Sequence, residues 1–397
     1  MGCIVCSSCY NPEIRLKIVC GDRLPGQFSQ QVNYHGCVFY KLPIDLQRHS
    51  VLPFLSLRDY VWLDTALGSQ DGLTSHLHLL MAKETVYAKK SNARAIADWF
   101  YSRRLSPYRV IFTTKVPSYS AALVSWMMSD TKELVIRGYQ PKLPRTVRYD
   151  LISNLTLLDI RDFFAEKQAL RKLLRGNLLL QEVHLFNGYA VLAELTQLPQ
   201  LHTLGLYFCP PLTPQLVKRV LLGCPSLHSL TLRYLYNRIP LRVPIVEWTA
   251  RWMGGLRSLS LLHCSHLYDT DLLALAQHCP NLTSCDISTN TIFTDITYEG
   301  VATLVKGLPL LQVLGLNERK TLTDECVLAL ALHCQQLRIL RIDGCVLITA
   351  EALCVLARYC PALEEVHCER CTAITAEGIG QLAAAHPHLR LHSSYTI

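Results

Sequence analysis

The 397-residue sequence lacks several features that define common classes of protein. No apolar run reaches the roughly 18 residues that a membrane-spanning helix needs, so we expect no spanning segment. No basic stretch followed by an apolar core and a cleavage site opens the chain, so we expect no secretory signal. The hydrolase Gly-x-Ser-x-Gly elbow, the His-Glu-x-x-His zinc helix and the dinucleotide-binding glycine fingerprint are also missing, so no catalytic role is predicted.

One segment approaches a phosphate-binding loop without completing it. Gly21 and Gly26 follow a strand-like run, as the glycines of such a loop do. However, Gln27 stands where the loop needs a lysine, and Phe28 where it needs a magnesium-binding hydroxyl. We therefore expect no bound cofactor and predict that the chain is not an enzyme.

A long repeat dominates the second half of the chain. From Leu201 onward, the pattern Leu-x-x-Leu-x-Leu-x-x-Cys is followed by a polar turn and an apolar stretch that ends in Cys or His. Its central apolar position advances in steps of 26 or 29 residues, through Leu204, Leu230, Leu259, Cys285, Leu314, Leu340 and Val366. This pattern predicts an α/β leucine-rich-repeat solenoid, with parallel strands on the concave side and helices on the convex side. Such a fold presents a long surface to partners rather than enclosing a catalytic pocket.

Four regions are predicted along the chain. Residues 1–40 form an N-terminal segment, 41–84 a small helical module, 85–200 irregular early repeats and 201–397 the regular array. In the regular array, threonines before the helices, such as Thr323, Thr349 and Thr375, are expected to cap them. The early repeats are traced by alternating apolar pairs at Val110 and Phe112, Leu134 and Ile136, Leu158 and Ile160, and Val183 and Leu185.

The 17 cysteines follow the repeat rather than the pattern of a small disulfide-bonded protein. A cysteine in a fixed repeat slot packs as a small buried hydrophobe, which favours reduced thiols in a reducing compartment. We therefore expect a cytoplasmic location, with the nucleus and the inner membrane face as alternatives. One set recurs just after the strand (Cys209, Cys264, Cys345, Cys371) and another closes the repeat (Cys224, Cys279, Cys334, Cys360).

Charge is distributed unevenly between the two parts of the chain. Residues 1–260 carry 31 Lys and Arg against 17 Asp and Glu, whereas residues 261–397 carry 8 against 14. A basic region attracts acidic partners or an anionic membrane, and an acidic region repels both. Because the basic residues are scattered without interleaved aromatics, no nucleic acid partner is expected. A plain solvated surface is the alternative explanation.

Residues 42–67 have the pattern of two short amphipathic helices joined by a turn. They resemble the first two-thirds of an F-box, and the array resembles the cysteine-containing leucine-rich repeats of F-box proteins. The resemblance implies that this segment binds a cullin-linked adaptor of a ubiquitin ligase, while the repeats recruit an unknown protein substrate for ubiquitination. The residues that carry the match are Leu42, Pro43, Leu46, Val51, Leu55, Leu57 and Leu63.

The F-box resemblance has two departures, which keep other interpretations open. Residues 68–72 lack the basic residues and Trp that are usual there, and Pro53 occupies a position that is commonly helical. The segment could instead be a helical cap that seals the open end of the solenoid. In that case the chain is a leucine-rich-repeat scaffold for protein interactions, without a link to a ligase.

The N-terminus offers a candidate membrane anchor. Removal of Met1 would expose Gly2 for myristoylation, and Cys3 or Cys6 could accept palmitate, similar to the start of Src-family kinases. Two chains anchor a protein stably while one does so only marginally, so this predicts peripheral membrane association. A disordered tail with reactive thiols is the alternative. No metal site is expected, because these cysteines lack a second pair at zinc-binding spacing.

Strand side chains that do not enter the core are expected to line the concave face and to bind the partner. Tyr207 is expected to be exposed there and to act as an anchor, because aromatics are enriched at interface centres. Arg341 is expected beside Glu365 or His367 on the next strand. For each of these residues, the alternative is that its side chain is simply solvated on the sheet surface and binds no partner. The predicted set is Tyr207, Arg233, Asp286, Asn317, Arg341, Asp343, Glu365, His367 and Glu369.

Overall fold

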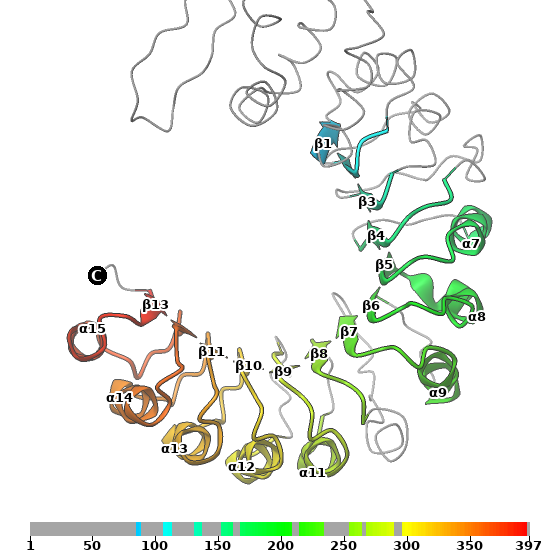
Figure 1. Cartoon of the computed structure of the whole chain (residues 1–397). Coiled ribbons are helices and arrows are strands. Elements are labelled where there is room, and N and C mark those ends of the chain that lie inside the picture. The colour runs from blue at the N-terminus through cyan, green and yellow to red at the C-terminus, as the bar shows by residue number, and fades with distance from the viewer. Residues whose placement is uncertain are drawn as a thin grey trace, which may run out of the picture.

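The strands and helices form a solenoid in a computed structural model. This structure describes residues 85–88, 106–112, 131–136, 152–161, 167–208, 214–233, 254–263, 267–289 and 296–394. Within them, thirteen strands make one sheet in which each strand pairs with its neighbour in sequence. The strands line the inside of an arc and the helices its outside (Figure 1). The predicted leucine-rich-repeat solenoid is therefore confirmed.

The strands are three to five residues long, as expected for this class of repeat. They are β1 (Thr85–Ala88), β2 (Arg109–Phe112), β3 (Glu133–Ile136), β4 (Leu157–Ile160), β5 (Glu182–Phe186), β6 (Thr203–Tyr207), β7 (Ser229–Arg233), β8 (Ser258–Leu262), β9 (Ser284–Asp286), β10 (Val313–Gly315), β11 (Ile339–Arg341), β12 (Glu365–His367) and β13 (Arg390–His392). The alternating pairs predicted in the early repeats fall on β2, β3, β4 and β5 and are confirmed.

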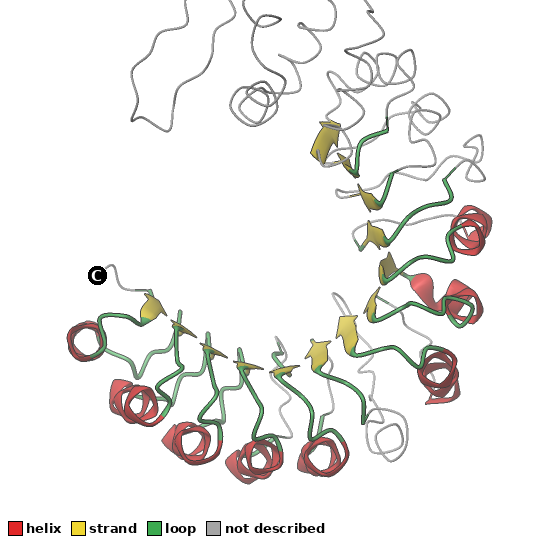
Figure 2. Ribbon diagram, viewed as in Figure 1, coloured by secondary structure: helices red, strands yellow, loops and turns green. Residues whose placement is uncertain are grey.

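The described helices lie on the convex side of the sheet (Figure 2). They are α7 (Lys167–Gly176), the short η4 (Gly188–Val191) and α8 (Leu192–Leu195), α9 (Pro214–Gly223), α11 (Asp269–His278), α12 (Tyr298–Gly307), α13 (Asp324–His333), α14 (Ala350–Tyr359) and α15 (Ala376–Ala385). Among the described residues, no helix combines the length and the apolar character that a membrane crossing requires.

The central apolar positions of the repeats stack in register through the sheet. Leu204 pairs with Leu230 across a step of 26 residues, and Leu230 with Leu259 across a step of 29. The same row continues back to Val183 and forward to Leu391. Because each unit buries its central residue only against its neighbours, this row is the spine of the core. Full burial of one such side chain contributes about 1.5–3 kcal/mol.

Threonine caps begin several of the convex helices. The hydroxyls of Thr349 and Thr375 accept hydrogen bonds from the backbone N–H groups of Ala352 and Gly378, as the sequence predicts. Thr323 also occupies the cap position, but its hydroxyl donates to the carboxylate of Glu325 and not to the helix backbone. Two of the three predicted caps are thus confirmed in full.

The cysteine slots are buried and satisfied by carbonyl groups of the preceding repeat. Cys345 donates to the carbonyl of Leu316 at 3.2 Å, and Cys371 contacts that of Ile342 at 3.1 Å. The cysteines that close the repeats are also buried. All ten cysteines in the described residues are free thiols. Cys209 and Cys264 lie outside the described residues.

Arg319 occupies the slot that cysteine fills in later repeats. It lies five residues after Leu314, as Cys345 lies five after Leu340. Its side chain is only 2% exposed. The guanidinium donates from Nε and Nη2 to the carbonyl of Ile287, at 3.1 and 2.7 Å. The repeat pattern gives no indication of this buried cation.

Candidate functional site

The outward side chains of the sheet form rows along the concave face. In β12, for example, Val366 is buried while the residues on either side of it are partly exposed. The register places Arg341, His367 and His392 in one row, and Glu365 beside Arg390 in the next. The side chains are thus positioned by the period of two within each strand and by the stacking of the repeats.

Tyr207 lies on this face, but the prediction that it is exposed is wrong. Its side chain is buried, with 5% of the residue accessible. The guanidinium of Arg161 lies 5.3 Å from the ring centroid, and the Tyr207 hydroxyl lies 3.5 Å from Nδ1 of His184. Arg161 is itself held by three hydrogen bonds from its guanidinium to Asp159. Neighbouring repeats therefore cover the aromatic ring that the sequence offers as an anchor.

A second polar contact supports His184 at this end of the described sheet. Its Nε2 lies 2.7 Å from Oε1 of Glu182. This hydrogen bond, and the histidine's charge, hold the pKa of Glu182 below its ordinary value despite partial burial, which acts in the opposite direction. Next to them, the rings of Phe186 and Phe208 stack with centroids 5.4 Å apart. This part of the face is built mainly from internal contacts.

The middle of the face carries Arg233, His263 and Asp286, all partly exposed. Burial and the neighbouring Arg233 lower the pKa of His263, while Asp286 acts in the opposite direction. Asp286 Oδ1 also accepts a hydrogen bond from the backbone N–H of Ser288 at 3.0 Å. The predicted residues Arg233 and Asp286 are therefore close enough to influence the same imidazole.

A ladder of polar side chains runs along one rim of the sheet. The backbone N–H of Asn317 donates to Oγ of Ser288, that of Asp343 to Oδ1 of Asn317, and that of Glu369 to Oδ1 of Asp343. Each side chain thus accepts the N–H group of the following repeat. Asn317 and Asp343, predicted as partner-binding residues, have a structural role that periodicity alone does not reveal.

The last repeats bring together one carboxylate and two imidazoles. Oε1 of Glu365 lies 2.7 Å from Nε2 of His392 and 3.4 Å from Nε2 of His367. The hydrogen bond from His392, together with the charges of Arg390 and the histidines, lowers the pKa of Glu365. The two rings stack with centroids 4.3 Å apart. The sequence offered Glu365 and His367 but not His392. The register partner of Val366 is the adjacent Leu391, which follows it by 25 residues rather than by the 26 or 29 of the other repeats.

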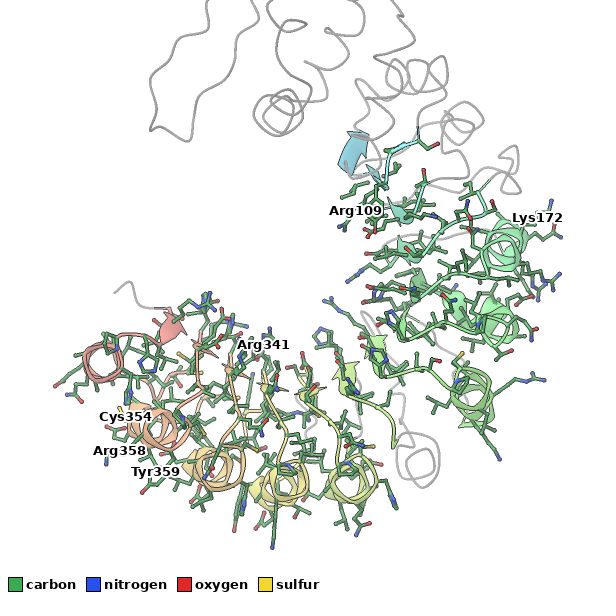
Figure 3. The ribbon with its side chains drawn as sticks, in the orientation of Figure 1. Arg109, Lys172, Arg341, Cys354, Arg358 and Tyr359 are labelled. Atoms are coloured by element: carbon green, nitrogen blue, oxygen red, sulfur yellow. The ribbon has the colours of Figure 1, made fainter. Side chains whose placement is uncertain are left out.

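Arg341 lies beside His367 on the next strand, as predicted. Figure 3 shows Arg341 on the inner side of the arc, whereas Cys354, Arg358 and Tyr359 extend from α14 on the outer side. Glu365, which the sequence also offered as a neighbour of Arg341, instead contacts the two histidines and Arg390. Among the described residues, no ion pair joins Arg341 to a carboxylate.

The described residues contain a small cavity, but it belongs to the core. It is lined by apolar side chains, including Leu204, Leu206, Leu230 and Leu232, and has a volume of about 10 Å³. A cavity of this size holds at most about one water molecule. The polar and charged side chains that could bind a partner therefore lie on the open concave face.

Two sets of predicted site residues lie outside the described residues. One is the F-box-like set Leu42, Pro43, Leu46, Val51, Leu55, Leu57 and Leu63. The other is the lipidation set Gly2, Cys3 and Cys6. Both remain predictions from sequence.

Comparison with known proteins finds similarity at the level of solved structures only. No protein-family model matches the chain, and no curated protein matches it. One similar structure is from the Rad7 and Elc1 complex in yeast, with 14% identity and a TM-score of 0.46, covering 83% of this chain and 84% of that one. Another is the leucine-rich-repeat-containing protein LegL7 from Legionella pneumophila, with 15% identity and a TM-score of 0.41, covering 78% and 91%. Likeness at this level carries no argument about function.

Proposed function

We propose that this chain is a non-enzymatic recognition protein that binds a protein partner on the concave face of β7–β13. The observation that supports this is a set of partly or fully exposed polar side chains on one face of a continuous parallel sheet, whose described helices lie on the opposite side. They include Arg233, Asp286, Arg341, Glu365, His367 and His392. A repeat solenoid of this kind binds partners on an extended surface, and such binding does not require a deep pocket.

Two arginines of the face favour a partner that presents carboxylates to them. Glu365 is already engaged by Arg390 and two histidines, so much of its negative charge is balanced within the protein. Arg341 and Arg233 are partly exposed on the same face. Arginine is enriched at interface centres and forms bidentate bonds to carboxylates.

Residue-specific photo-crosslinking tests this face in cells. A photoreactive residue in place of Arg341 or Ser260 on the concave face should capture the same protein, since both positions point to one surface. The matched control places the same residue at Tyr359, which is exposed on the convex helix α14. Capture of one protein equally from both faces, or of none from the concave positions, would contradict the proposal.

The finer proposal is that the partner is a ubiquitination substrate and that residues 41–84 join the chain to a cullin-RING ligase. It is supported by the F-box-like residues, such as Leu42, Pro43 and Leu55, preceding a cysteine-containing repeat array. The chain would then act by proximity, holding its target near the ligase without taking part in the chemistry. A scaffold without ligase linkage is the alternative.

Two charge-changing variants separate these functions. Leu55→Asp should abolish binding of the purified cullin adaptor and leave crosslinking from the concave face intact. Arg341→Glu should do the opposite, because it lies on the sheet and far along the chain from the F-box-like segment. If wild-type protein fails to bind the adaptor while its concave face still captures a partner, the scaffold alternative holds.

The Met-Gly-Cys start favours one further proposal, membrane anchoring of an otherwise cytoplasmic protein. Gly2→Ala removes the acceptor for myristate and should move the protein from the membrane fraction to the soluble fraction, because a single remaining chain anchors weakly. Ser7→Ala provides a control that leaves Gly2, Cys3 and Cys6 in place. An unchanged distribution of the Gly2 variant would end this proposal.

A further inference from the structure

We propose that Glu365, His367 and His392 bind a divalent transition-metal ion of the zinc class at the C-terminal end of the concave face. The three residues each offer one ligand atom, and these atoms lie within 4.8 Å of one another. This metal site is independent of the protein partner and of ligase linkage. It adds a metal site where the sequence predicts none.

The fold brings these residues together through two adjacent strands. Glu365 and His367 are separated by one residue on β12, so their side chains leave the same face of the sheet. His392 on β13 is the register partner of His367. This pairing stacks the two imidazoles, whose planes differ by only 10°. Both Nε2 atoms consequently face the same carboxylate oxygen of Glu365.

The distances between the donor atoms are close to those of a zinc site. Zinc binds imidazole nitrogen and carboxylate oxygen at about 2.0–2.2 Å, which places two ligands of a tetrahedral site roughly 3.3 Å apart. The Glu365 Oε1 to His367 Nε2 distance of 3.4 Å already matches this spacing. The 2.7 Å contact with His392 Nε2 must open by about 0.6 Å to reach this spacing. The His392 ring, which now lies parallel to that of His367, must also rotate so that both Nε2 lone pairs point at one ion. His392 is exposed and can make this movement.

The second oxygen of Glu365 has a partner of its own. Nη2 of Arg390 lies 3.6 Å from Oε2, while Oε1 is the atom that faces the histidines. Outer contacts of this kind orient a metal-binding carboxylate. Two His and one carboxylate leave a coordination position open, as in catalytic rather than structural zinc sites. Here the open position faces the concave surface, where water or a carboxylate or histidine of a bound partner could fill it.

Positively charged side chains near the site should weaken its affinity for a metal cation. Arg341 pairs in register with His367, and Arg390 approaches Glu365, so a bound cation would lie near two guanidinium groups. The geometry therefore predicts that Arg341→Gln binds the metal more tightly than the wild type. If the three residues had only a structural role, Arg341→Gln would not be expected to change metal affinity.

Another histidine pair, directly before β6 and β7, provides a matched control. The rings of His202 and His228 also stack, with centroids 5.0 Å apart. Their polar contacts are to the hydroxyl of Thr203 and the carbonyl of Ser226, rather than to a carboxylate. If stacked histidines alone were sufficient, this pair would bind metal as well.

The test uses the full-length protein after chelator treatment, titrated with Co²⁺ and then competed with Zn²⁺. One site with the visible absorption of nitrogen and oxygen coordination is expected. Glu365→Gln, His367→Ala and His392→Ala should each weaken binding by more than the roughly 10–100-fold typical for loss of an outer contact. His202→Ala/His228→Ala should bind like the wild type. Circular dichroism and thermal unfolding of each variant without metal show whether the fold is kept.

Three results would overturn the proposal. The first is absence of a cobalt site in the folded wild-type protein. The second is unchanged affinity in folded variants of the three ligands. The third is a thiolate-to-cobalt charge-transfer band as the sole signal, since that would assign the ion to the cysteines. Loss of adaptor or partner binding with the metal site intact would instead contradict the proposed function alone.

Discussion

Arg319 donates two hydrogen bonds to the carbonyl of Ile287, at 3.1 and 2.7 Å. This carbonyl corresponds by repeat position to that of Leu316, which accepts from Cys345 in the next repeat, and to that of Ile342, which contacts Cys371. The residue in the buried slot after the strand thus supplies a hydrogen-bond donor to a carbonyl of the preceding repeat. A thiol is this donor in the later repeats, and a guanidinium is the donor here.

Truncation at this slot should cost more for the arginine than for a cysteine. Arg319→Ala removes two charge-assisted hydrogen bonds and leaves the buried Ile287 carbonyl without this donor, so a loss of about 3 kcal/mol in the free energy of unfolding is expected. Cys345→Ala removes one weak donor and little volume, with an expected loss of about 1 kcal/mol. Urea denaturation of the two variants measures the difference. Equal losses would show that Arg319 is not an essential donor.

The sequence was sufficient to predict the parts of the fold that repeat. The central position could be followed from Leu204 to Val366 because each unit buries the same apolar residue against its neighbours. The same periodicity identified the helices and the cysteine slots. It also placed Arg341 next to Glu365 or His367, and the register pairs it with His367.

Properties that depend on a particular pair of side chains were not predictable in this way. Tyr207 has the position of an exposed aromatic, but Arg161 lies over its ring from far back in the sequence. Arg319 breaks the cysteine pattern with a residue type that is rarely buried. The carboxylate–histidine cluster required His392, which belongs to an incomplete last repeat with a strand but no following helix among the described residues.

The rim ladder makes a prediction about Asp343. Its Oδ1 accepts the backbone N–H of Glu369 at 2.8 Å, as Oδ1 of Asn317 accepts that of Asp343. Asp343→Asn keeps an acceptor oxygen and should change the free energy of unfolding by less than about 0.5 kcal/mol. Asp343→Ala removes the acceptor and should cost about 1 kcal/mol. Chemical denaturation checks both, and an equal loss for Asn and Ala would show that the hydrogen bond contributes nothing.

The thiols make a prediction about chemical modification. Burial raises the pKa of Cys224 and Cys360 to about 11 and that of Cys279 to about 12, so these groups carry little thiolate at pH 8. Cys354 is partly exposed on the convex side. Among the described cysteines, Cys354 should therefore be alkylated first in the native protein, as measured by peptide mass spectrometry.

Denaturation provides the control for this labelling experiment. In denaturant without reductant, the buried cysteines should all become alkylated, because they are free thiols in the structure. Persistent protection of a pair such as Cys334 and Cys360 under these conditions would reveal a disulfide. Rapid native labelling of Cys279 would show instead that the helix and strand around it open easily.

Acid should destabilise the protein partly through Glu182. The hydrogen bond with His184 lowers the pKa of this carboxyl below its ordinary value of 4.5 in the folded state. The stabilisation is therefore fully present above pH 4.5 and is lost as the pH falls through the lower folded pKa. The free energy of unfolding, followed by denaturation between pH 7 and 3, should fall less steeply for Glu182→Gln than for the wild type. Glu377 is exposed on α15, and its carboxylate accepts a hydrogen bond from Gln381. Glu377→Gln should therefore follow the wild-type slope. Identical slopes for all three proteins would show that Glu182 does not contribute to the acid sensitivity.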